Sequence, residues 1–211
     1  MEAIANFITT SIADIKELQA KNEDFPFSVV KKLPDRLKLI SNSEVAKIFL
    51  QTVFEQADES VLKKGFKWNP AYDIICSYMA DNENKGLVMV GSCGTGKSII
   101  LNSALPILFN MSRFIMSPVT AYDLSAHNFR KLLQRKFIAI DEIGREFIGN
   151  DYGSKFEMLE IIADHCEKNG KLLFLTSNLS YEALLTRYGE PCIDRLKKIC
   201  KWVEFTGASC R

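Results

Sequence analysis

The sequence predicts an α/β protein with a five-stranded parallel sheet flanked by helices. From residue 86 onward, short β-rich runs alternate with stretches of helical periodicity. The β-rich runs cover residues 86–90, 113–117, 136–141, 171–177 and 201–207. Strands that alternate with helices form parallel sheets covered on both faces, so the strands can be apolar throughout. A glycine-rich turn at residues 91–96, between the first strand and a helical stretch, agrees with this arrangement.

The helices around these strands are predicted from periodicity and capping residues. Asn69 followed by Pro70 is a favourable helix start, with Asn as the cap and Pro in the first turn. Further helices are expected after Gly96, over 126–134, over 154–169 and over 181–188. Ser154 and Glu157 have the spacing of a capping box.

The first 65 residues are predicted to be mostly helical. Apolar residues recur there at helical spacing, and this apolar stripe comprises Ile4, Phe7, Ile8, Ile12, Ile15 and Leu18. A second helix is expected after Ser41, because Ser41 and Glu44 have capping-box spacing. We therefore divide the chain into a small helical N-terminal region, residues 1–65, and a second domain, residues 66–211.

Composition narrows the class of protein. The 211 residues are 47% hydrophobic, which is enough for one substantial core. Lys and Arg total 27 against 26 Asp and Glu, so the net charge predicts no strong attraction to nucleic acid or membranes. The N-terminus lacks the pattern of a signal peptide and no apolar run approaches membrane-spanning length, so we expect a cytoplasmic protein. Six cysteines without a C-x-x-C pair suggest neither a zinc site nor a disulfide framework.

The segment GSCGTGKS, residues 91–98, matches the phosphate-loop pattern G-x-x-x-x-G-K-[ST]. The pattern lies after a predicted strand and before a predicted helix, where backbone N–H groups and the helix N-terminus surround phosphates. We expect ATP there, with Lys97 reaching the β and γ phosphates and Ser98 binding Mg²⁺. The predicted nucleotide-binding residues are Gly91, Ser92, Cys93, Gly94, Thr95, Gly96, Lys97, Ser98 and Ile99.

Polar side chains end two further strands. Asp141 and Glu142 follow the run KFIAI, at the carboxyl edge where open α/β sheets bind ligands. Asp141 is predicted to hold Mg²⁺ through water, and Glu142 to polarise the attacking water. Asn178, after the fourth strand, is expected to orient that water. The alternatives are a solvated turn for the acidic pair and a helix cap for Asn178, although Ser180 is better placed to cap.

These motifs together resemble a known family. The order of GSCGTGKS, FIAIDEIG, LTSNLSYEALLTRYGEPCIDRL and WVEFTGASCR is similar to that of the AAA+ ATPases of the DnaC/DnaI helicase-loader and IstB transposition-helper family, over roughly residues 66–211. The resemblance implies the P-loop NTPase fold of AAA+ type, ATP hydrolysis and nucleotide-dependent homo-oligomers. It also implies a protein partner: a replicative DNA helicase for a loader, or a transposase for an IstB-like protein. The sequence does not decide between the two partners, although an IstB-like protein would be expected to carry a basic DNA-binding surface, which the near-neutral charge does not indicate.

The resemblance also implies roles for arginines near the C-terminus. Arg195, in the D-R-L element, matches the arginine finger that reaches into a neighbouring subunit, and Arg187 is the less favoured choice. Arg211 matches the second nucleotide sensor. The alternative for Arg195 is a surface salt bridge with an acid such as Asp194 or Glu190.

Two features distinguish the sequence: one departs from the family pattern, and the other departs from that of most AAA+ proteins. The segment between the second and third predicted strands is shorter than in the family, which counts against contact with single-stranded DNA. The sequence stops after the fifth strand, so no C-terminal helical lid is expected, as in the loaders.

The N-terminal apolar stripe is expected either to dock on the helicase or to pack on the core, and the sequence does not separate the two.

Overall fold

The computed structural model describes residues 37–57, 67–124, 126–144, 149–151, 154–156 and 158–207. Its centre is a five-stranded sheet in the order β2-β3-β6-β1-β7, and all of its strand pairs are parallel. The strands are β1 Gly86–Gly91, β2 Val119–Thr120, β3 Phe137–Ile143, β6 Leu172–Ser177 and β7 Cys200–Phe205. The predicted five-stranded parallel sheet is therefore confirmed.

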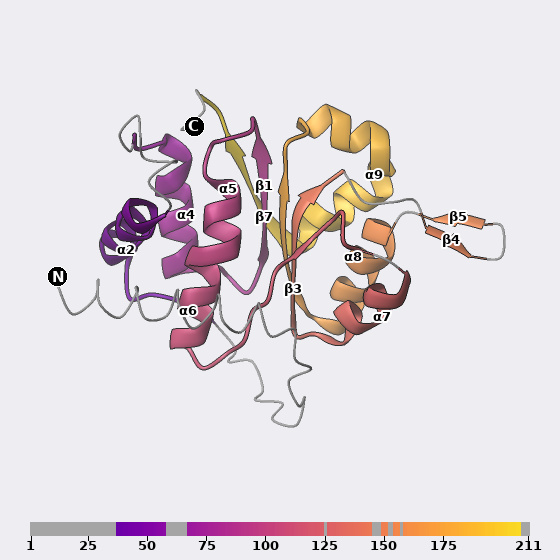
Figure 1. Ribbon diagram of the computed structural model, residues 1–211, viewed down its shortest axis with the longest axis horizontal. Coiled ribbons are helices and arrows are strands. Elements are labelled where there is room, and N and C mark those ends of the chain that lie inside the picture. Colours follow the sequence, from indigo (N-terminus) through magenta and orange to yellow (C-terminus); the bar gives the residue numbers. More distant parts are fainter. Residues whose placement is uncertain are drawn as a thin grey trace.

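Helices cover both faces of the sheet, which makes a three-layer molecule (Figure 1). One face carries α2 Ser43–Gln56, α4 Pro70–Ala80 and a helix built from α5 Lys97–Ile99, the π-helical turn η1 Ile100–Ala104 and α6 Leu105–Met111. The other face carries α7 Ala126–Gln134, α8 Met158–Asn169 and α9 Tyr181–Ile199. Among the described residues, no helix is long and apolar enough to span a membrane.

Strand β1 shows how the two cores are separated. Leu87 and Met89 pack into the core on the α4 side, whereas Val88 and Val90 pack into the core on the α8 side. Because side chains alternate along a strand and both faces are covered, every residue from Gly86 to Val90 is buried. Gly86 is required for the close approach of strands: a Cβ there would lie 2.0 Å from the Leu173 carbonyl oxygen.

The second strand is not where the sequence predicted it. Residues 113–117 form no strand, and β2 is the two-residue segment Val119–Thr120. The prediction followed a real alternation, since Phe114 and Met116 are buried and Ile115 is 62% exposed. The backbone at this point ends α6 instead: the N–H of Phe114 donates to the Phe109 carbonyl at 2.9 Å. Alternating burial thus indicates an extended segment, but not one paired with a neighbouring strand.

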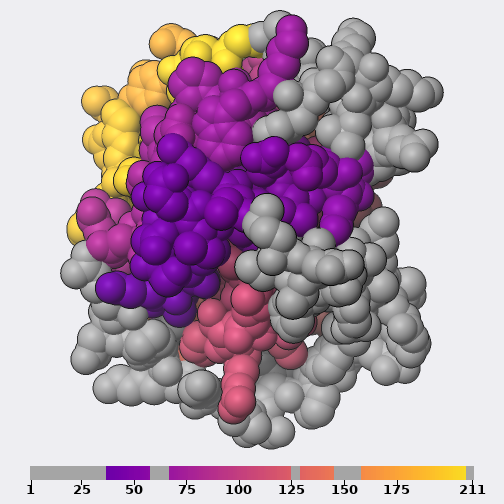
Figure 2. Space-filling model, turned by 90° about the vertical axis from the view of Figure 1, so that its left-hand side faces the viewer, coloured from indigo at the N-terminus to yellow at the C-terminus, as the bar shows by residue number. Residues whose placement is uncertain are grey.

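Helix α2 packs on the sheet domain. Its cap is Asn42 and not Ser41, because the Asn42 side chain accepts the Val45 N–H at 2.9 Å. Leu50 and Phe54 lie in the same core as the strands, and Figure 2 shows residues 37–57 lying across this face beside α4. Residues 1–36, with the apolar stripe, and residues 58–66 lie outside the described part of the chain.

Three other predicted helices have different outcomes. Asn69 caps α4 with Pro70 in the first turn, as predicted. The helix predicted over 154–169 begins only at Met158, because Ser154–Phe156 forms β5, which pairs antiparallel with β4 Gly149–Asp151. Ser154 therefore caps no helix, because it begins β5 instead. The helix predicted over 181–188 continues to Ile199 across a kink at Gly189.

Candidate functional site

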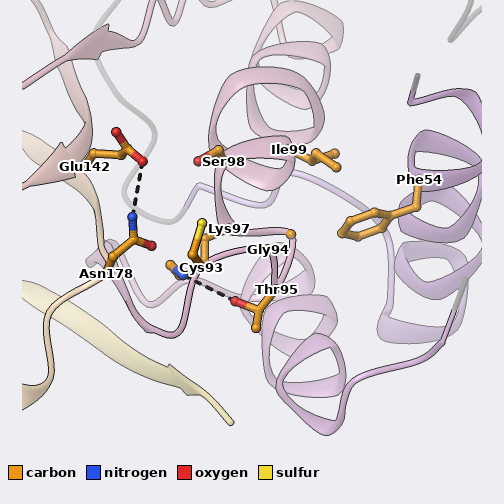
Figure 3. Close-up of a pocket in the computed structure, with 10 residues that line it drawn as sticks. Phe54, Cys93, Gly94, Thr95, Lys97, Ser98, Ile99, Glu142 and Asn178 are labelled. Carbon is orange, nitrogen blue, oxygen red and sulfur yellow. Dashed lines mark hydrogen bonds between the residues drawn. The ribbon is translucent and has the colours of Figure 1, made fainter. Parts of the chain in front are cut away.

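The site lies at the carboxyl ends of β1, β3 and β6, where the loop from β1 to α5 faces the end of β3 (Figure 3). A pocket there is lined by Phe54, Cys93, Gly94, Thr95, Gly96, Lys97, Ser98, Ile99, Glu142 and Asn178. The fold thus brings most of the predicted loop residues together with Glu142 and Asn178. Gly91 and Ser92 lie at the base of the loop and contact Lys97 through their carbonyl groups.

The loop is held in shape by aromatic residues of α2 and α4. Gly96 has a φ of 84°, which favours glycine, and a Cβ there would lie 2.7 Å from the Phe54 ring and 2.8 Å from the Tyr72 hydroxyl oxygen. The Tyr72 hydroxyl donates to the Thr95 carbonyl at 3.1 Å, and the Thr95 hydroxyl donates to the Ser92 carbonyl at 2.9 Å. The loop conformation therefore depends on helices outside the motif.

Lys97 is buried inside the loop. Its residue is 4% exposed, and its ammonium donates to the carbonyl oxygens of Gly91 at 2.8 Å and Ser92 at 2.7 Å and to the Thr95 hydroxyl at 3.2 Å. Burial lowers the pKa of Lys97 below its ordinary value, because removal from water disfavours the charged form. These three hydrogen bonds go to neutral oxygens, so an anion in the pocket would be a better partner for this charge.

Asp141 connects the loop helix to β6. Ser98 Oγ donates to Asp141 Oδ1 at 3.0 Å, and the Thr176 hydroxyl donates to the same oxygen. Asn102 Nδ2 donates to Asp141 Oδ2 at 2.7 Å. A serine hydroxyl beside a carboxylate provides hard oxygen ligands, the type that Mg²⁺ prefers. The residues predicted to hold the ion, Ser98 and Asp141, therefore fit it chemically.

Glu142 lies at an irregularity in β3. The β3–β6 register shifts between Ile140 and Ile143, and Glu142 has a φ of 61°, which is uncommon for a residue with a side chain. Its N–H donates to the Thr176 hydroxyl at 2.8 Å, so the displaced backbone keeps a partner. Neighbouring side chains of a regular strand point to opposite faces, and the bulge allows Asp141 and Glu142 to serve one site.

Asn178 lies beside Glu142 in the pocket lining. Its Nδ2 donates to Glu142 Oε1 at 3.1 Å, as the dashed line in Figure 3 marks. The helix that follows is capped by Ser180, whose side chain accepts the Ala183 N–H. The alternative interpretation of Asn178 as the cap is thus wrong, and its side chain is placed beside the acid predicted to act on water.

The arginines predicted for a neighbouring subunit's site do not line this pocket. Arg195 Nε donates to Glu167 at 2.9 Å, and its Nη2 lies 3.5 Å from Asp164. The ion-pair partners are therefore acids of α8, rather than Asp194 or Glu190. The Arg187 guanidinium lies over the Tyr188 ring, 5.4 Å from its centroid. Arg211 lies outside the described residues.

Sequence reasoning missed three contributors to the site. Phe54 supports the loop from α2, and no motif near it pointed to this contact. Thr176 links Asp141 to the Glu142 backbone, although only its place at a strand end was visible in the sequence. Asn102 follows Ser98 by four residues, one turn along the helix, so that spacing could have found it.

The fold and the glycine-rich loop define a class of protein, without reference to any particular relative. A five-stranded parallel sheet with a glycine loop between β1 and the next helix is the α/β fold of P-loop NTPases. No family model matches the sequence, and no curated protein matches it in sequence.

Solved structures resemble the chain in fold. A crystal structure of the DnaC helicase loader superposes with a TM-score of 0.54 at 18% identity, over 69% of this chain and 96% of that chain. A crystal structure of DnaI superposes with a TM-score of 0.52 at 15% identity, over 72% of this chain and 95% of that chain. The similarity to DnaC and DnaI that the motifs predicted is confirmed at the level of the fold.

The contact between Tyr72 and the loop generates a prediction. Tyr72→Phe removes the hydroxyl that holds the Thr95 carbonyl, so we expect weaker nucleotide binding and a loss of about 1 kcal/mol in the free energy of unfolding. Tyr78→Phe is the matched control, because the Tyr78 hydroxyl donates to the Lys85 carbonyl outside the pocket. Chemical denaturation and titration of a fluorescent nucleotide measure the two effects. Equal loss of nucleotide affinity in both variants would show that the Tyr72 contact has no special role.

Proposed function

We propose that this protein binds and hydrolyses ATP with Mg²⁺ as an AAA+ ATPase of the helicase-loader type, which assembles on a replicative DNA helicase and delivers it during DNA replication. One observation carries the proposal: the loop residues Lys97 and Ser98 line one pocket with Glu142, and Ser98 is hydrogen-bonded to Asp141 at its side. A phosphate-binding group, an oxygen donor set for Mg²⁺ and a base for water are the parts that phosphoryl transfer to water needs.

Each group has a separate task in the proposed reaction. Lys97 exchanges its carbonyl partners for phosphate oxygens, while the backbone N–H groups of the loop surround the phosphates. Ser98 and Asp141 hold the ion, which when bound neutralises charge on the phosphates. Glu142 accepts a hydrogen bond from the attacking water and takes up its proton.

Asn178 supports the role of Glu142. The 3.1 Å bond between them places an amide donor and a carboxylate acceptor at the same wall of the pocket. A water molecule that reaches both groups would donate to Glu142 and accept from Asn178. This pairing orients the oxygen lone pair of the water, which is the requirement for attack on a γ phosphate.

The oligomer is proposed to complete the site with Arg195. Its side chain is 26% exposed, and Asp164 and Glu167 hold its guanidinium against α8. A finger of this kind stabilises charge on a nucleotide held by another subunit. The ion pairs would fix the direction of the side chain at the surface, and the proposal predicts that activity depends on subunit contact.

Mixed subunits test the shared site. Alone, Glu142→Gln is expected to slow ATP turnover at least about a hundredfold, because a positioned base is lost. Alone, Arg195→Ala is expected to slow it about a thousandfold. A mixture should recover activity, because some interfaces then pair an intact Glu142 with an intact Arg195. Phosphate release measures the turnover.

The control for this experiment is a chain that carries both substitutions, mixed with Arg195→Ala. It has no intact Arg195 at any interface and should stay inactive. If the mixture of single variants also stays inactive at every ratio while both proteins assemble, Arg195 does not act between subunits.

The partner is proposed to be the helicase rather than a transposase, and the N-terminal region is proposed to dock it. The motif resemblance and the fold shared with DnaC and DnaI support the helicase. A truncation up to residue 60 would remove α2, whose Phe54 packs against the loop. Point substitutions in the N-terminal apolar stripe therefore separate docking from folding better than truncation.

Helicase capture tests the partner. Phe7→Asp with Ile8→Asp in the full chain should abolish nucleotide-dependent co-elution with the purified cognate helicase, because a charge in a docking face is costly to bury. Asn6→Asp with Thr10→Asp is the matched control on the other side of the predicted helix. Capture by both variants would reject the stripe as the docking face. Failure of the wild-type chain to capture the helicase would make a transposase the next partner to assay.

A further inference from the structure

The amide of Asn102 contacts the carboxylate proposed to serve Mg²⁺. Asn102 lies in η1, one turn after Ser98 on the same helix, and its Nδ2 donates to Asp141 Oδ2 at 2.7 Å. Ser98 and Thr176 donate to the other oxygen, Oδ1. Asp141 is 7% exposed, so these protein donors largely replace water around its charge.

We propose that Asn102 is a positioning residue for the Mg²⁺ site: its amide fixes the rotation of the Asp141 carboxylate and thereby the orientation of the Ser98 hydroxyl. The inference rests on the proposed nucleotide function and assigns a role to a residue outside the phosphate-loop and acidic motifs. Asn102 does not contact nucleotide in this account, since it acts through Asp141.

The Ser98 hydroxyl has a single hydrogen to donate. Because that hydrogen is donated to Asp141 Oδ1, the lone pairs of Ser98 Oγ are left for a cation. This arrangement requires Oδ1 to face Ser98. The torsion that turns a carboxylate is broad, so a contact is needed to fix it. Thr176 holds Oδ1 from β6, and Asn102 holds the opposite oxygen, so together they fix the rotation of the carboxylate.

The chemical type of the residue suits this task. An amide donates a hydrogen bond without bringing a positive charge, so the Asp141 carboxylate keeps its full charge for a divalent cation. A lysine or arginine at the same place would hold the carboxylate equally well, but it would repel the ion. Asparagine thus orients the acid while leaving the site electrostatically available to Mg²⁺.

The helix itself is irregular at this residue. Ile100–Ala104 forms a π-helical turn between α5 and α6, and Asn102 is its central residue. Turns of this kind are rare and appear frequently at functional sites. The irregularity and the 2.7 Å contact coincide at the residue that reaches Asp141.

The experiment measures Mg²⁺ dependence rather than turnover. A fluorescent, non-hydrolysable ATP analogue is titrated into the full chain in EDTA, and Mg²⁺ is then titrated into the complex. Asn102→Ala and Asn102→Leu both lack the donor, and the leucine keeps the bulk of the side chain if the alanine variant fails to fold. Asn110→Ala, at an exposed position on α6, is the matched control.

Both Asn102 variants should bind the analogue in EDTA as tightly as wild type does. For the half-maximal effect of Mg²⁺ on the complex, they should need about tenfold to a hundredfold more Mg²⁺ than wild type. This is the range for losing a hydrogen-bond partner of a metal ligand. Asn110→Ala should match wild type in Mg²⁺ requirement and melting temperature, whereas both Asn102 variants should melt at a lower temperature, because the buried Asp141 carboxylate then lacks a donor.

Three results would overturn the inference: an unchanged Mg²⁺ requirement, a defect in the alanine variant that leucine repairs, or an equal loss of affinity in EDTA. If the wild-type chain binds no nucleotide, the proposed function itself fails, and the role of Asn102 fails with it.

Discussion

The carboxylate of Asp141 is the point at which the parts of the site are joined. It lies near the carboxyl end of β3, it is 7% exposed, and it accepts hydrogen bonds from the loop helix and from β6. A carboxylate so far removed from water is costly unless donors surround it. The protein supplies those donors from Ser98, Asn102 and Thr176, and the same bonds set the distance between the phosphate loop and the sheet edge.

The second constraint acts on the loop from outside the motif. Phe54 and Tyr72 pack against Gly96 so closely that no side chain could be accommodated there. Both aromatic residues belong to helices that precede β1, and they form part of the larger core on that face. The phosphate-loop motif is therefore shaped by α2, within the N-terminal region, and by α4, just after that region. A partner bound to that region would be close in the chain to the helix that supports the loop.

Much of the fold could be predicted from the sequence, for reasons that differ between elements. The buried parallel strands β1 and β6 are recognisable by their apolar runs. The start of α4 is predictable from Asn69 and Pro70 alone, because a cap and a first-turn proline act locally. The strand predicted at 113–117 was wrong because Phe114 and Met116 alternate in burial without a hydrogen-bonded neighbour. The hairpin of β4 and β5 was missed because a Ser-x-x-Glu spacing resembles a helix start.

The parts of the candidate site that could be predicted are those whose residues belong to a recognisable sequence motif. The loop pattern and the strand ends predicted that Lys97, Ser98, Glu142 and Asn178 lie at one edge of the sheet, and the four residues line one pocket there. The bulge at Glu142 and the support from Phe54 depend on contacts between distant segments, and no local pattern encodes those. The acids that pair with Arg195 lie on α8 for the same reason.

The most direct test of the account is calorimetric titration of ATP with Mg²⁺ into the full chain and into Lys97→Ala. The account predicts that the wild-type chain binds one nucleotide and that the variant loses this binding, because the buried ammonium exchanges neutral carbonyl partners for phosphate. Lys85→Ala, at an exposed lysine before β1, should bind like wild type. Undiminished binding by Lys97→Ala, or no binding by the wild-type chain, would contradict it.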